Sequence, residues 1–78
     1  MPYIAIEAFP KDEETKRKIV DRIEEAFLET WGCPREAITI SIEEVAPSDW
    51  DAKVRIPKIV PNMGAMAILD GERQGRYR

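Results

Sequence analysis

The sequence predicts an α/β protein built around one βαβ unit, with short helices after it. Three stretches predict this class: apolar and polar residues alternate at positions 3–9 and again at 37–45, and an amphipathic pattern fills positions 13–31. A helix between two strands carries the chain back across the sheet. We therefore expect the two strands to run parallel, with a right-handed crossover.

The first strand is expected over residues 3–9. Ile4, Ile6 and Ala8 fall on one face of this stretch, which is the period of two that marks a half-buried strand. Pro10 follows directly and ends the strand, because proline has no backbone N–H to donate.

The helix is expected over residues 13–31. Asp12 is a suitable N-cap, because its carboxylate can accept hydrogen bonds from the free N–H groups of the first turn. Gly32 can adopt the left-handed conformation that ends a helix, and Pro34 prevents continuation. Apolar residues three and four apart form a single stripe along this helix: Ile19, Val20, Ile23, Ala26, Phe27 and Trp31.

Charged residues cover the opposite face of this helix, which we expect to be exposed to solvent. Acidic residues there precede basic ones by four positions, an order that favours weak ion pairs within a helix. The predicted pairs are Asp12–Lys16, Glu13–Arg17 and Glu14–Lys18.

The second strand is expected over residues 37–45, again with a period of two. Glu43 and Glu44 point to opposite sides of this strand, so we expect them to face solvent or an interface and not to form a catalytic pair. One face carries Ile38, Ile40 and Ile42, and the other carries Thr39, Ser41 and Glu43.

Prolines divide the rest of the chain. Pro57 and Pro61 each break or start a helix, so we expect one short helix near residues 50–55 and another near residues 61–69. Residues 72–78 form a polar, locally basic tail.

The chain is short for a stable core. We expect residues 1–78 to form a single domain, and a two-stranded sheet is too small to be stable alone. Cys33, the one cysteine, can form no internal disulfide, and without histidine there is no plausible zinc site. We therefore expect copies of the chain to join their sheets, as a homodimer first and as a homohexamer, a trimer of dimers, next.

The composition argues against several partners. The net charge is −3, whereas nucleic-acid binding favours a basic surface. No apolar run approaches the about 20 residues of a membrane span, and the start lacks the basic region of a signal peptide. We expect a cytoplasmic protein with neither nucleic acid nor membrane as partner.

The sequence also excludes common catalysts. Without histidine, Cys33 has no imidazole to activate it, and Ser/His/Asp chemistry is impossible. No glycine-rich phosphate loop or metal-ligand spacing is present, so we expect no cofactor and no metal. One group with an ordinary pKa of about 7.7–8.0 remains, the α-amine. If Met1 is removed, this group is the secondary amine of Pro2, and partial burial with nearby cations would make it a base.

Four segments together resemble the 4-oxalocrotonate tautomerase family: "MPYIAIEAF", "DEETKRKIVDRIEEAF", "GCPREAITISIEEV" and "SDW", within residues 1–50. The resemblance implies small βαβ subunits with an amino-terminal proline, here Pro2, as catalytic base. It also implies keto–enol tautomerisation of a small 2-oxo or enol acid. The later segment "IVPNM" is similar to a dimeric bacterial subgroup with phenylpyruvate-type tautomerase activity.

Other site residues follow from the resemblance position by position. The family's carboxylate-binding arginine before the helix corresponds to Lys11, a point charge without a bidentate fork. The family's arginine on the second strand corresponds to Thr39, so Arg35 or a cation of another subunit must replace it. Thr39, Ser41 and backbone N–H groups are further candidates to stabilise the enolate. Trp50 takes the place of an active-site phenylalanine and would close the pocket.

Two alternatives stay open. A hydratase or dehalogenase of unsaturated acids would use a protonated Pro2 and more cations than the sequence offers. A catalytically silent oligomerisation or binding module is favoured by the missing strand arginine, and it would follow if Met1 were retained, because Pro2 would then be an amide without basicity.

Overall fold

The computed structural model describes residues 1–78 and divides them into two compact units, residues 1–46 and residues 47–78. The single domain over residues 1–78 stays a prediction.

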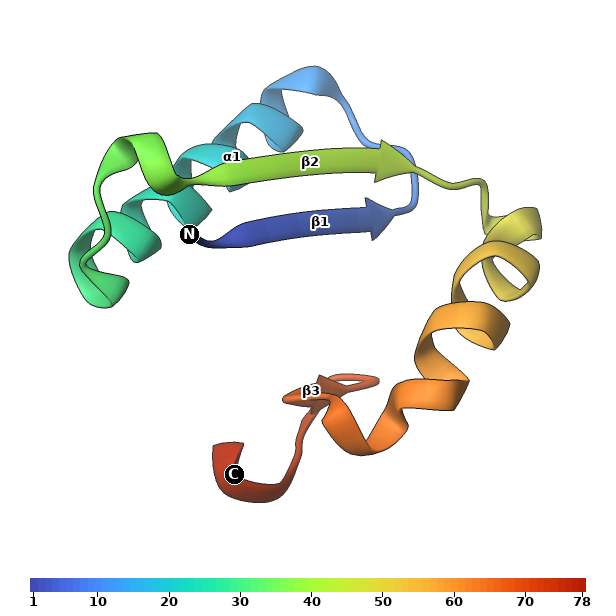
Figure 1. Cartoon of the computed structure of the whole chain (residues 1–78). Coiled ribbons are helices and arrows are strands. Elements are labelled where there is room, and N and C mark those ends of the chain that lie inside the picture. Colours follow the sequence, from blue (N-terminus) through green and yellow to red (C-terminus); the bar gives the residue numbers. More distant parts are fainter. The chain divides into compact units, whose positions relative to one another are not determined.

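The N-terminal unit is the predicted βαβ unit (Figure 1). Strand β1 (Tyr3–Ala8) leads to helix α1 (Glu13–Ala26), which continues as one wider π-helical turn, η1 (Phe27–Trp31), before strand β2 (Thr39–Glu44). β1 and β2 pair in parallel, and α1 lies along one face of the pair (Figure 1). The predicted fold class is confirmed.

The two faces of the sheet differ as the alternation predicts. Ile4 and Ile6 of β1 are half-buried on the side of α1, and Ile40 and Ile42 of β2 are half-buried with them. On the opposite face the side chain of Tyr3 is 72% exposed. Within the N-terminal unit, this second face is open to solvent.

The ends of the helix are set by the predicted residues. The Asp12 carboxylate accepts hydrogen bonds from the Thr15 N–H at 3.0 Å and from the Thr15 hydroxyl at 2.7 Å. Gly32 has a φ of 80°, and its N–H donates to the Phe27 carbonyl at 2.9 Å. The helix expected over residues 13–31 is confirmed, with its last turn widened.

Only part of the predicted ion pairing is found on this helix. Lys18 contacts Glu14 at 3.3 Å as predicted, whereas Lys16 contacts Glu13 at 2.7 Å and does not pair with Asp12. The reason is that Asp12 serves as the N-cap, and its carboxylate is directed to Thr15.

Both strands are shorter than predicted. β1 ends at Ala8 instead of Phe9, and β2 begins at Thr39 because residues 35–37 form a 3-10 turn, η2 (Arg35–Ala37). The Ala37 N–H is used by the Pro34 carbonyl at 3.0 Å and therefore does not join the sheet. Val45 follows β2 and still donates its N–H to the Ala8 carbonyl at 2.9 Å.

The C-terminal unit contains the short helices that the sequence predicts, with different bounds. A turn, η3 (Pro47–Asp49), precedes a π-helical segment, η4 (Asp51–Ile59), and then a 3-10 segment, η5 (Val60–Ala65). A helix end at residue 55 is wrong, because η4 passes through Pro57. A π-helical turn is wider than an α-helical one and leaves more room for the proline ring.

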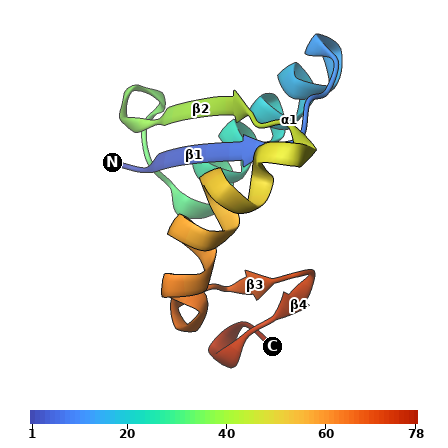
Figure 2. The same cartoon turned by 90° about the vertical axis from the view of Figure 1, so that its right-hand side faces the viewer.

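The predicted helix near residues 61–69 is wrong beyond Ala65. Strands β3 (Ile68–Leu69) and β4 (Glu72–Arg73) form a small antiparallel hairpin (Figure 2). Asp70 and Gly71 have φ values of 49° and 84°, as a two-residue type I′ turn requires. The signal for this hairpin was the Asp-Gly dipeptide itself. The Arg55 guanidinium also donates from Nη1 to Asp70 Oδ1 at 3.1 Å and from Nη2 to Asp70 Oδ2 at 3.2 Å.

Candidate active site

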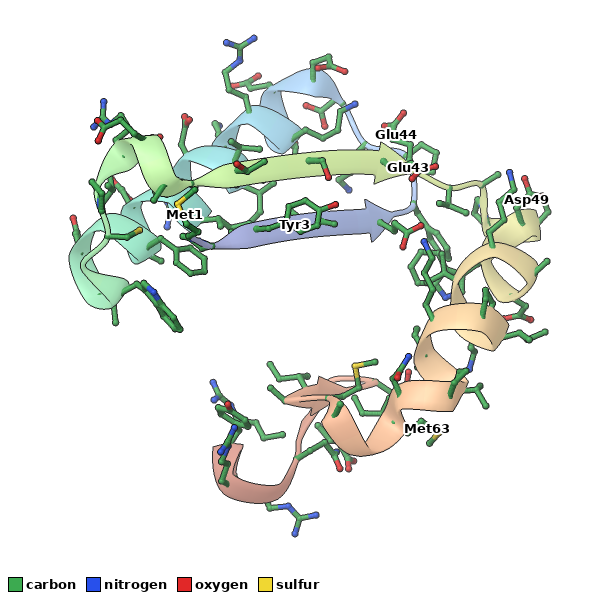
Figure 3. The ribbon with its side chains drawn as sticks, viewed as in Figure 1. Met1, Tyr3, Glu43, Glu44, Asp49 and Met63 are labelled. Atoms are coloured by element: carbon green, nitrogen blue, oxygen red, sulfur yellow. The ribbon has the colours of Figure 1, made fainter.

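Pro2 lies at the N-terminal edge of the parallel sheet. It is half-buried, and its carbonyl accepts the Thr39 N–H at 3.2 Å. Met1, which precedes it, is 96% exposed and lies at the same edge (Figure 3). The structure therefore brings Pro2 and Thr39, two of the predicted site residues, side by side.

Hydroxyl groups lie on the open face of the sheet next to Pro2. Thr39 pairs with Tyr3 in the strand register and Ser41 pairs with Ala5. All four residues are exposed on the side that α1 does not cover, where the Tyr3 ring is visible in Figure 3. The Thr39 backbone N–H is already used by Pro2, so its hydroxyl is the donor that Thr39 can offer to a ligand.

Arg35 lies at the same end of the sheet as Pro2. It belongs to η2, directly before β2, and its carbonyl accepts the Ile38 N–H at 3.2 Å. Its side chain is exposed and pairs with no carboxylate. Arg35 is thus a cation available at the end of the sheet that holds Pro2 and Thr39.

Lys11 lies at the opposite end of the sheet. It follows the C-terminal end of β1, whereas Pro2 precedes its N-terminal end. The six residues of β1, at about 3.3 Å each, separate the two ends by about 20 Å, several times the length of a lysine side chain. The structure therefore does not bring Pro2 and Lys11 of one chain together.

A cavity of about 320 Å³ lies beside Lys11, between the sheet and α1. It lies entirely within the N-terminal unit and is almost wholly apolar, so Lys11, Lys16 and Glu44 line it mainly with the carbon atoms of their side chains. The rest of its lining is mainly apolar: Ile6, Ala8, Phe9, Ile19 and Ile42. Lys11 thus lines an apolar cavity, and its ammonium pairs with no carboxylate.

Glu44 has a role that the sequence did not predict. Its Oε2 atom accepts the Lys11 backbone N–H at 3.0 Å and contacts the Lys16 ammonium at 3.2 Å. The hydrogen bond from Lys11, followed by the one from Lys16, holds the pKa of Glu44 below its ordinary value. The contact with Glu13, followed by that with Glu44, raises the pKa of Lys16. The period of two could have indicated this contact, since Glu44 shares the helix-facing side with Ile42.

Lowering the pH should therefore reduce the stability of the wild-type protein against urea more than that of a Glu44→Gln variant. The pKa of Glu44 is lower in the folded chain than in the unfolded chain, so its stabilisation is present above about pH 4.3 and is lost as the pH falls through the folded value. Urea midpoints at pH 7 and pH 3, at one protein concentration, would measure the loss. Glu14→Gln, which removes an exposed carboxylate of α1, is the control. A loss in Glu44→Gln equal to that of wild type would contradict this assignment.

Trp50 belongs to the other unit, directly before η4, and is half-buried there. Its place in a pocket with Pro2 stays a prediction.

No group of three or more histidine, cysteine or acidic side chains is placed to hold a metal ion. None of the helices is both long and apolar enough to cross a membrane.

Comparisons with known proteins agree with this geometry. The family model described as "Tautomerase enzyme" matches residues 2–56. A solved structure, YwhB, a homologue of 4-oxalocrotonate tautomerase, is similar with a TM-score of 0.54 and 35% identity over 58% of this chain and 75% of that chain. A search of curated proteins finds no match. With most of its length matched and the βαβ unit in place, the chain belongs to the tautomerase family of isomerase-type enzymes.

Proposed function

We propose that the protein catalyses keto–enol tautomerisation of a small 2-oxo acid, with the amine of Pro2 as general acid and base once Met1 is removed. The observation that carries this proposal is the match to the tautomerase family, which begins at residue 2. The hydrogen bond between Pro2 and Thr39 supports it, because it would hold the amine rigidly at the start of β1.

The amine would move one proton between oxygen and carbon. As a free base it accepts the proton of the enol hydroxyl, and the resulting ammonium returns a proton to the adjacent carbon, so no other reactant is consumed. An α-amine has an ordinary pKa of about 7.7–8.0, and partial burial or a nearby cation lowers it. Half-burial of Pro2 and the position of Arg35 at the same end of the sheet both favour the free base.

Charge that develops on the enolate oxygen needs a donor near Pro2. The Thr39 and Ser41 hydroxyls are exposed on the open face beside it, and the Arg35 guanidinium is available at the same end of the sheet. We assign enolate stabilisation to Thr39 and Arg35, with Ser41 two residues further along the same face of β2.

The substrate carboxylate would be held by Lys11 of a second copy. Within one chain Lys11 and Pro2 lie at opposite ends of β1, about 20 Å apart, so a site that uses both requires two chains. Trp50, as the apolar wall of the pocket, is part of the same proposal. Each subunit would then contribute to more than one site.

An unfinished sheet supports this assembly. Parallel sheets are normally covered on both faces, yet the pair of β1 and β2 has one open face and no further strands. Apart from Ala37, Val45 and Val54, no apolar residue of the chain is buried. We infer a homodimer in which the sheets of two copies join, with a homohexamer as the larger alternative.

A variant that keeps its methionine tests the catalytic amine directly. Intact mass should show that wild-type protein lacks Met1 and converts enolic 2-oxo acids. Insertion of a lysine between Met1 and Pro2 prevents removal of the methionine by making the second residue large, and acylated Pro2 has no basicity. We expect this variant to fold and assemble as wild type but to lose at least about 100-fold in kcat/KM. Full activity of this variant would rule out the Pro2 amine, and a silent module would show no activity in either protein.

A further inference from the structure

We propose that Glu44 is a positioning residue for substrate binding: its carboxylate fixes the backbone of Lys11, and so directs the Lys11 ammonium to the substrate carboxylate. This inference rests on the proposed function, in which Lys11 is the carboxylate-binding group. Glu44 itself would touch neither substrate nor Pro2.

Lys11 lies in the short connection between β1 and α1, outside the paired residues of the sheet. Its N–H donates to Glu44 Oε2 at 3.0 Å, which bridges 33 positions of sequence. Since Glu44 faces Ala8 in the last register pair of the sheet, this bond ties the loop to the rigid end of β2.

The Glu44 side chain is itself held in position by α1. Lys16 contacts the same oxygen at 3.2 Å, and Glu13 contacts Lys16 at 2.7 Å. The Lys16 side chain is only 21% exposed, which makes this contact better sheltered than the surface pair of Lys18 and Glu14. α1 thus holds the carboxylate, and the carboxylate holds the loop.

The arrangement of charges leaves the Lys11 ammonium available to a ligand. The Glu44 carboxylate is neutralised by Lys16 and accepts the Lys11 backbone N–H, so it forms no ion pair with the Lys11 ammonium. That ammonium pairs with no carboxylate, and the Lys11 residue lines the apolar cavity of about 320 Å³. A carboxylate ligand with an apolar group therefore finds a cation whose backbone is already ordered, which lowers the entropic cost of binding.

Two substitutions separate the hydrogen bond from the charge. Glu44→Ala removes the acceptor for Lys11, and we expect KM for the enol of phenylpyruvate to rise about tenfold, with kcat within about twofold of wild type. Glu44→Gln keeps an oxygen that can accept the Lys11 N–H, so KM should rise only about two- to threefold. The matched control is Glu14→Gln, which should leave both constants unchanged.

A double-mutant cycle distinguishes positioning from a general structural effect. If Glu44 acts through Lys11, Glu44→Ala should raise KM less than about twofold in a Lys11→Ala background. The dissociation constant of 3-phenylpropanoate, measured by NMR titration on the same four proteins, gives a readout that does not depend on turnover.

The results of these measurements separate the positioning role of Glu44 from the catalytic role of Pro2. Equal effects of Glu44→Ala with and without Lys11 would overturn the positioning role, as would a wild-type affinity for 3-phenylpropanoate no higher than that of Lys11→Ala. If Pro2→Ala keeps full activity while the cycle shows coupling, the catalytic proposal fails and the positioning role stands. If Pro2→Ala is inactive and the cycle shows no coupling, only the positioning role fails.

Discussion

Pro2→Ala should lower kcat/KM for an enolic 2-oxo acid by about 10²- to 10⁴-fold, which is the usual contribution of a general acid or base. Alanine also permits removal of Met1, so the variant keeps a terminal amine. That amine is primary and lies on a more flexible backbone, and it would be less rigidly placed than the proline nitrogen beside Thr39. The loss should appear mainly in kcat.

The pH dependence of the same two proteins provides an independent measurement. In wild type, kcat/KM should rise with pH through the ionisation of the Pro2 amine, at a value below about 8, and then level off or fall. Pro61→Ala, in η5 of the C-terminal unit, is the matched proline control and should keep the wild-type profile. A Pro2→Ala variant with unchanged kcat/KM and an unchanged profile would show that the base is another group.

Two variants of low activity should restore activity when they assemble together. Pro2→Ala lacks the base, and Lys11→Ala lacks the carboxylate-binding cation. If each site takes Pro2 from one chain and Lys11 from another, a hybrid contains some sites with both residues intact. When equal amounts of the two variants assemble at random, about one quarter of all sites have both residues intact, in a dimer or in a hexamer. The reason is that each of the two positions is intact with a probability of about one half.

Refolding the two variants together, and separately before mixing, measures this effect. At substrate concentrations below KM, the co-refolded sample should approach about one quarter of wild-type activity, whereas the separately refolded sample should show only the residual activities of the two variants. Identical activity in the two samples would contradict a shared site. It would also require Lys11 to act within its own chain, against the length of β1 that separates it from Pro2.

Local pattern was enough to predict the βαβ unit. The alternation of Ile4 and Ile6 needs only the period of a strand, and the caps at Asp12 and Gly32 need only neighbouring residues. The hairpin at Asp70 and Gly71 is as local, because the Asp-Gly dipeptide by itself favours a type I′ turn.

The bounds of elements were harder, because they depend on competition for single hydrogen bonds. The Ala37 N–H is taken by Pro34 and not by the sheet, and η4 continues through Pro57 where an α-helix would end. Neither outcome follows from residue preferences alone.

The amino-acid sequence was sufficient to predict the fold class and, since it contains no histidine, to exclude several kinds of catalyst. Periodicity and chemical inventory are properties of the chain and need no coordinates. Two contacts are visible only in the folded chain: Glu44 accepts the N–H of Lys11, 33 positions away, and Lys16 pairs with Glu44 and Glu13 instead of Asp12. The reason is that such partners are chosen by the distance between α1 and β2 after the crossover has formed, and no spacing within the sequence encodes that distance.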